Sequence, residues 1–246
     1  MKIGLQIPKY LGIGDCIQFA HIPENLHYYT GQKTYDLDSS WIFDHNPFIK
    51  RDTKNNDIDI VINLWEASHL FPVNGFKSHA ERFFMFFNKK FNTNFINPIL
   101  RHPRLYIHEN IETIVNTITV HTTGKSETEP MSDEIIETIN NKYSKNYTIY
   151  QIGGYQDKST PFINKLGLSI WDTAKLISQS AVFIGVNSGM MNLANCYPAV
   201  QKKILIPRDV ERFLPMSEHS SWFDHNNMFF NYTKNDIGAT FSYLKI

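Results

Sequence analysis

The sequence predicts an α/β protein built on parallel sheets, and three of its features support this prediction. Short apolar runs, which are typical of buried strands, alternate with segments of helical periodicity. Loops of glycine and small polar residues follow several of the apolar runs, as they do at strand-to-helix turns. A second series of these units begins near residue 116. Alternation of strands with helices is the pattern of a parallel sheet that is covered on both faces.

The first series predicts two strands and two helices. The apolar run over 2–7 is expected to be a buried strand, and a glycine-bearing loop leads from it to a helix that starts at Cys16. The run over 57–65 alternates and then becomes apolar, which predicts a second strand. Aromatic side chains at helical spacing over 78–91 predict a helix, with Ser78 as its N-cap.

The second series is longer and begins after a stretch of weak periodicity that contains two prolines. Its boundary is placed near residue 110, which predicts one domain over 1–110 and another over 111–246. The helix over 131–144 has Ser132 as a cap and acids in its first turn. The other expected elements are a strand over 116–124, a strand over 147–154, a helix over 169–180, a strand and helix over 183–194, and a last strand before Pro207.

Composition limits the classes of partner. The chain has 246 residues, with 24 lysines and arginines against 24 aspartates and glutamates, so its formal net charge is zero. This balance argues against nucleic-acid binding and allows at most peripheral contact with a membrane. Two cysteines, Cys16 and Cys196, match neither a disulfide framework nor a metal spacing and suit a reducing cytosol. The sequence shows no signal peptide or membrane span, so we expect a cytoplasmic protein.

The stretch FIGVNSGMMNLA, residues 183–194, places small polar residues between an apolar strand and an apolar helix. Asn187 or Ser188 can cap the helix, and Gly189 lets a ligand approach the backbone. The free N–H groups of such a turn can bind an anion. Helix capping alone is the simpler explanation of these three residues, so the loop by itself does not establish a site.

The stretch HTTGKS, residues 121–126, has a similar place after a predicted strand. The hydroxyls of Thr122 and Thr123 suit phosphate oxygens, Gly124 leaves room, and Lys125 can neutralise charge. The glycine spacing of a P-loop is missing. The alternative is a polar surface loop.

The first predicted strand leads to LGIGD, which contains Gly12, Gly14 and Asp15. It is not the dinucleotide fingerprint, because that pattern requires glycine where this chain has Ile17. The two glycines could admit a substrate, or Asp15 could be only an acid in the first turn of a helix. The histidines form no metal-binding pattern, and Ser188 does not lie in the G-x-S-x-G motif of a serine hydrolase.

Taken in order, these loops resemble those of the heptosyltransferases, the family 9 glycosyltransferases. The shared features are the Gly14-Asp15 pair, DHNPFI over 44–49, the strand into VHTTGKS, and FIGVNSGMMNLA. The last stretch matches the family's most specific motif, an apolar strand followed by Gly-Asp-Ser/Thr-Gly and His-Leu-Ala. In this chain Asn187 replaces the usual acid and Asn192 replaces the usual histidine. The chain is also shorter than typical members, so its acceptor half is expected to be trimmed.

The resemblance implies a compact GT-B fold, with two Rossmann-like halves facing a cleft, and an inverting transfer without metal or other cofactor. The donor would be a nucleotide-diphosphate sugar carrying a heptose or hexose, and the acceptor a glycan or small hydroxyl compound, as in polysaccharide biosynthesis. Asp15 would be the catalytic base on the acceptor-side domain over 1–110, and the domain over 111–246 would bind the donor. The expected substrate-binding residues are Gly12, Gly14, Thr122, Thr123, Gly124, Lys125, Gly153, Gly154, Asn187, Ser188, Gly189, Met190 and Asn192.

Two other functions remain open at this stage. A nucleotide-sugar epimerase or hydrolase of the same architecture would need no acceptor. A non-catalytic module that binds a nucleotide sugar would be consistent with the two asparagine replacements.

Overall fold

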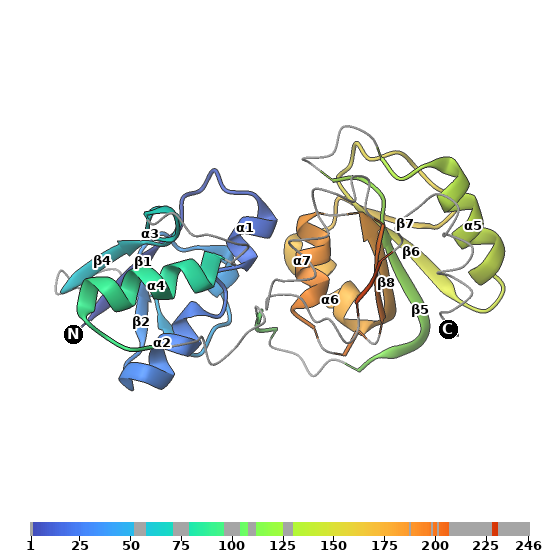
Figure 1. Cartoon of the computed structure of the whole chain (residues 1–246). Helices are drawn as coiled ribbons and strands as arrows, with labels where there is room; N and C mark the ends of the chain where they lie inside the picture. The colour runs from blue at the N-terminus through green and yellow to red at the C-terminus, as the bar shows by residue number, and fades with distance from the viewer. Residues whose placement is uncertain are drawn as a thin grey trace. The chain divides into compact units, whose positions relative to one another are not determined.

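The computed structural model describes residues 2–51, 58–70, 79–95, 104–107, 112–124, 130–186, 188–197, 199–200, 202–206 and 228–230. The described residues form two compact units, one that ends by residue 107 and one that begins at residue 112 (Figure 1). Each unit has a parallel sheet of its own. In the part of the chain that the structure describes, no helix is both long and apolar enough to cross a membrane.

The first unit is built on four parallel strands in the order β3-β2-β1-β4. Their bounds are β1 Ile3–Gln6, β2 Thr34–Asp36, β3 Ile49–Lys50 and β4 Ile60–Asn63. The helices are α1 Ile13–Ile17, α2 Ile22–Thr30, α3 Leu64–His69 and α4 His79–Phe91, with a short 3-10 helix over Trp41–Phe43.

Apolar spacing accounts for the packing of the first unit. Phe83, Phe84 and Phe87 share one side of α4 and are buried. The helix α2 has a proline in its first turn, where a missing N–H breaks no helical hydrogen bond, and Gly31 caps its C-terminal end. Gly31 has a φ of 66°, the left-handed conformation that a glycine adopts readily.

The second unit is built on six parallel strands in the order β10-β9-β8-β5-β6-β7. Their bounds are β5 Ile114–His121, β6 Thr148–Gly153, β7 Ile163–Leu166, β8 Ser180–Val186, β9 Lys202–Ile206 and β10 Met228–Phe230. The helices are α5 Asp133–Tyr143, α6 Ile170–Gln179 and α7 Gly189–Asn195. Figure 1 shows α6 and α7 on one side of this sheet and α5 on the other.

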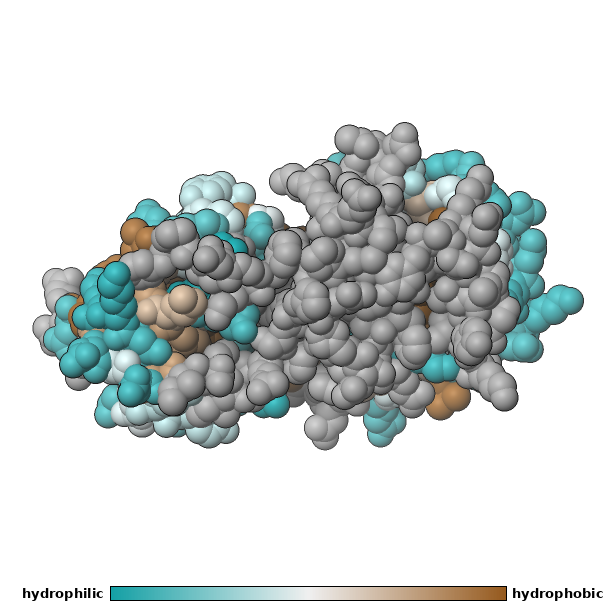
Figure 2. Space-filling view, in the orientation of Figure 1, coloured by the Kyte–Doolittle hydropathy of each residue, from teal (hydrophilic) through white to brown (hydrophobic). Residues whose placement is uncertain are grey.

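One large part of the core of the second unit lies between α5 and the sheet. Ile136 and Ile139 of α5 join Ile118 and Val120 of β5 and further aliphatic side chains of β8 and β9 in one buried cluster. Hydrophilic side chains cover the part of this unit where α5 lies (Figure 2). The Ser132 hydroxyl accepts a hydrogen bond from the Ile135 amide and caps α5, as predicted.

Most predicted elements are confirmed, and the differences lie mainly in short elements. The helix after the first strand begins at Ile13 instead of Cys16, so Gly14 lies inside it. Leu64 and Trp65, predicted as strand, open the helix α3. The strand before Pro207 is not the last, because β10 follows it in the chain. Ser78 lies outside the described residues. The elements that the pattern missed are β2, β3, β7, β10, α2, α3 and the short 3-10 helix.

Candidate functional site

The carboxyl ends of three adjacent strands gather the polar loops of the second unit. His121, the last residue of β5, is paired with Ile152 of β6 on one side and with Gly185 of β8 on the other. The loops that leave β5, β6 and β8 therefore start from the same edge of the sheet. In open parallel sheets this edge is where ligands bind.

A side-chain pair joins two of these loops. The Oγ atom of Ser188 lies 3.0 Å from Nδ1 of His121. Ser188 occupies the N-cap position of α7, but its side chain makes no capping hydrogen bond. Of the two caps that the sequence allowed, Asn187 lies outside the described residues, and the Ser188 hydroxyl is directed to the imidazole at the end of the neighbouring strand β5 instead of to a helix amide.

Burial keeps the imidazole of His121 neutral. Only 5% of this residue is exposed, and desolvation lowers its pKa to about 4. At neutral pH the ring therefore has one N–H and one lone pair. Sequence reasoning did not select His121, although it is the first residue of the HTTGKS stretch and stands at the end of the strand.

A second polar network supports the loop after β5. Gln151 of β6 is fully buried, and its amide N donates to the Lys158 carbonyl at 2.7 Å and lies 3.5 Å from Thr122 Oγ1. The Gln151 carbonyl oxygen accepts from both the amide and the hydroxyl of Thr160, at 3.0 and 2.8 Å. Gln151 therefore ties the loop after β6 to the loop after β5.

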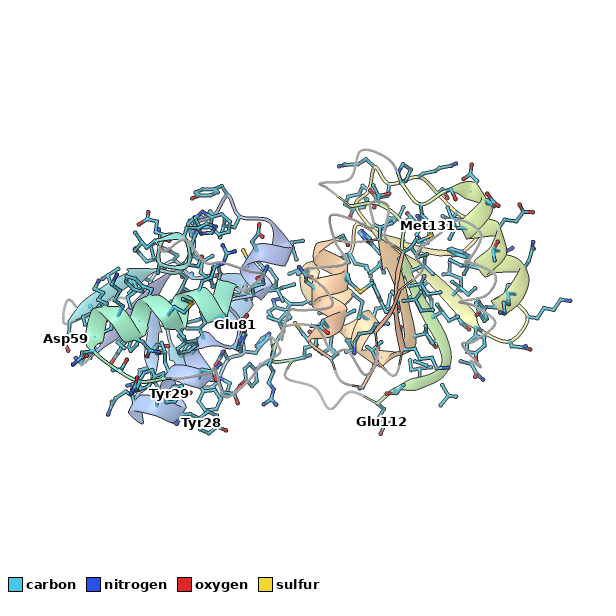
Figure 3. The ribbon with its side chains drawn as sticks, in the orientation of Figure 1. Tyr28, Tyr29, Asp59, Glu81, Glu112 and Met131 are labelled. Carbon is cyan, nitrogen blue, oxygen red and sulfur yellow. The ribbon has the colours of Figure 1, made fainter. Side chains whose placement is uncertain are left out.

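The backbone of the loop after β5 is held as well. The Met131 amide donates to the Thr122 carbonyl at 2.7 Å, and the Met131 side chain is buried (Figure 3). Thr122 is itself almost completely buried, whereas Thr123 is half-buried, and their hydroxyl oxygens are 3.5 Å apart. The hydroxyl of Thr123 is thus the more accessible of the two.

The two glycines at the end of β6, Gly153 and Gly154, have a role inside the chain. Gly153 has a φ of 147°, and a Cβ there would lie 2.0 Å from Oδ2 of Asp157. The same carboxylate oxygen accepts a hydrogen bond from the Gly154 amide at 3.0 Å. The Asp157 carboxylate fills the space over Gly153, so this turn explains the glycine without a ligand. Contact of Gly153 and Gly154 with a nucleoside stays a prediction.

The first turn of α7 starts beside the His121–Ser188 pair. The amides of Met191 and Asn192 donate to the Ser188 carbonyl at 3.1 and 3.3 Å. Gly189 and Met190 come before these two residues in the helix. The N–H groups at the start of a helix have no intrahelical acceptor, so the amides of Gly189 and Met190 can donate to a ligand. Ser188, Gly189, Met190 and Asn192 are all half-buried.

Asp15 belongs to the first unit and lies in the first turn of α1, after the N-cap Gly12. Burial raises the pKa of its carboxyl, while a backbone hydrogen bond at Gly12 and an electrostatic interaction with His69 lower it. His69 ends α3, the helix that follows β4, and β4 pairs with β1. Asp15 and His69 therefore follow adjacent strands of the first sheet.

Two predicted residues, Lys125 and Asn187, lie outside the described residues. Gly124 is described and is buried beside Thr123. Within the described ranges, no group of three or more histidine, cysteine, aspartate or glutamate side chains could hold a metal ion.

No protein-family model and no curated protein sequence matches this chain. Solved structures do match it. A glycosyl transferase family 9 protein from Veillonella parvula is 12% identical, with a TM-score of 0.63, and the match covers 100% of this chain and 89% of that one. The heptosyltransferase WaaC of E. coli, solved with ADP-2-deoxy-2-fluoro heptose, is 9% identical, with a TM-score of 0.65 and coverage of 100% and 99%. The chain has the GT-B fold of these proteins.

A third structure with this fold is larger. TibC of enterotoxigenic E. coli, an iron-containing dodecameric glycosyltransferase, is 15% identical, with a TM-score of 0.64, and the match covers 94% of this chain and 62% of TibC. Four short motifs predicted a resemblance to the family 9 glycosyltransferases, and the shared GT-B fold confirms this resemblance. Identities this low show the fold, and the activity has to be argued from the site.

Proposed function

We propose that this chain is a glycosyltransferase that moves a heptose or hexose from a nucleotide-diphosphate donor to a hydroxyl of a glycan or other acceptor, with inversion and without a metal. The main support is the set of polar groups at the carboxyl ends of β5 and β8, on a GT-B fold. Thr122, Thr123 and Ser188 supply hydroxyls there, and His121 and Gln151 hold two of them in place.

In this proposal the second unit binds the diphosphate of the donor. The hydroxyls of Thr123 and Ser188 and the amides of Gly189 and Met190 would donate to phosphate oxygens, and Lys125 would add a positive charge. Such donors stabilise the negative charge that develops on the diphosphate as the sugar leaves. Two of the solved structures with this fold hold related molecules: WaaC was solved with ADP and TibC with ADP-D-beta-D-heptose.

Asp15 is the proposed general base, which would accept the proton of the acceptor hydroxyl. Because burial raises the pKa of this carboxyl, its ionised form is a better proton acceptor than that of an exposed aspartate. The backbone hydrogen bond at Gly12 and the electrostatic interaction with His69 act in the other direction and favour the ionised form. These opposing effects on the pKa of Asp15 suit a general base, which must be ionised before the sugar is transferred and must accept a proton during the transfer.

A non-catalytic nucleotide-sugar-binding module is the second candidate, and Asn187 and Asn192 favour it. These residues stand where the family motif has an acid and a histidine, so the motif has lost two groups that can ionise. A hydrolase or epimerase is distinguished from both by its products, since it would form free sugar or an isomer without an acceptor.

The experiment is a thermal-shift panel of ADP, GDP, UDP and their sugar conjugates, followed by transfer assays with the donors that bind. A ligand at one hundred times its Kd stabilises the folded chain by about 2.7 kcal/mol, which is a measurable shift in Tm. Transfer to an added acceptor supports the proposal. Tight binding without turnover against any acceptor supports the binding module, and free sugar without acceptor supports the hydrolase.

A further inference from the structure

The His121–Ser188 pair raises the question of which atom donates. Nδ1 and Oγ are 3.0 Å apart, so a hydrogen bond joins them, and either partner can supply the proton. If Ser188 donates to Nδ1, its only hydroxyl proton is used inside the protein. If the imidazole donates from Nδ1, the Ser188 proton is left for another acceptor.

The position of the pair determines which acceptor the Ser188 proton can reach when the imidazole is the donor. His121 is the last residue of β5 and is buried, whereas Ser188 is half-buried at the carboxyl end of β8. The ring is thus fixed in the interior and the hydroxyl is on the side of the loops. The Ser188 hydroxyl makes no capping hydrogen bond with α7, so the backbone of the helix does not fix the direction of the hydroxyl.

We propose that His121 is a positioning residue, which donates its Nδ1 proton to Ser188 Oγ and so turns the Ser188 proton toward an oxygen of a bound diphosphate. The proposal rests on the proposed function, because it needs a diphosphate at this edge of the sheet. It assigns a role to a histidine that contacts the ligand only through the serine.

The electrostatics of the ring support this role. Desolvation lowers the pKa of His121 to about 4, so the ring carries a single proton at neutral pH and can be either tautomer. An anionic acceptor beside Ser188 favours the tautomer with the proton on Nδ1, since only this form frees the serine proton. A diphosphate is therefore expected to select that tautomer.

The test compares two replacements of His121. In His121→Asn the amide nitrogen is attached to Cγ, like Nδ1, and can still donate to Ser188. In His121→Gln the amide nitrogen lies one bond further out, near the place of Nε2, which makes this variant the matched control. Affinity is measured by calorimetry with ADP and with adenosine, and the difference between the two probes isolates the diphosphate.

We expect His121→Asn to bind ADP within about threefold of the wild type, and His121→Gln to bind ADP at least about tenfold more weakly, with little change for adenosine. In a Ser188→Ala background the His121→Gln change should have no further effect on ADP. Equal ADP affinities of wild type and His121→Gln would overturn the proposal, and so would an equal loss in both histidine variants.

Nuclear magnetic resonance of the unmodified chain gives a second test that does not depend on the variants folding. With 15N-labelled histidine, the nitrogen shifts of His121 report its tautomer. The ADP complex is expected to show the proton on Nδ1, and a proton on Nε2 would overturn the proposal. A wild-type chain that binds neither ADP, GDP nor UDP would overturn the proposed function together with this inference, whereas ADP binding with the Nε2 tautomer overturns the inference alone.

Discussion

Acidification is expected to destabilise the second unit through His121. Burial lowers the pKa of this histidine from 6.5 to about 4, so between these values the unfolded chain binds a proton that the folded chain does not. The stabilising effect is complete above pH 6.5 and is lost as the pH falls toward 4. The full shift corresponds to about 3 kcal/mol, and about 2 kcal/mol of it should disappear between pH 7 and pH 5.

Urea unfolding at pH 7 and pH 5 measures this loss, with His121→Asn as the control. Carboxyl groups titrate in both proteins, so the difference between their pH dependences isolates the histidine. The wild type should lose about 2 kcal/mol more than the variant over this interval. If the unfolding free energies of the two proteins fall in parallel, His121 is not kept neutral by burial, and the argument for its single proton fails.

Three further changes test other parts of the site. Asp15→Asn should lower transfer by about two to four orders of magnitude with little change in donor affinity, as measured by initial rates and calorimetry; near-normal turnover would leave Asp15 as only a helix acid. Lys125→Ala should weaken ADP binding more than adenosine binding in titrations, and equal weakening of both would indicate a folding defect instead. Gln151→Leu should lower the free energy of unfolding by at least about 1–3 kcal/mol in urea titrations, because it removes the bonds to Lys158 and Thr160; an unchanged free energy would mean that this network does not hold the loops.

Helical periodicity and apolar runs predicted the longer elements because these elements bury many side chains. The helix α4 presents buried apolar side chains at helical spacing, and the strands β5 and β8 contain continuous buried runs. The hydroxyls of Ser132 and Ser169 cap α5 and α6. The strands β2, β3 and β10 have only two or three residues, too few to show a period of two. Their strand conformation depends on pairing with distant neighbours in the sheet.

The candidate site was predicted only in part, for a similar reason. Strand-to-helix turns identified Thr122, Thr123 and Ser188 from local pattern alone. The contacts that fix these residues join positions far apart in the chain, such as Ser188 to His121 and Thr122 to Gln151. Those partners could be found only when the order of the strands was known, because β5 lies between β6 and β8.

The most direct test of the central claim is calorimetric titration of ADP, GDP and UDP into the wild type and Gly189→Val. A branched side chain at 189, the first residue of α7, is expected to obstruct the approach of phosphate oxygens to the first amides of the helix. The account predicts that at least one nucleoside diphosphate binds the wild type and that Gly189→Val abolishes this binding while circular dichroism and melting show a folded protein. A folded Gly189→Val chain that binds the same diphosphate with wild-type affinity would contradict the proposed site and most of the case for glycosyl transfer.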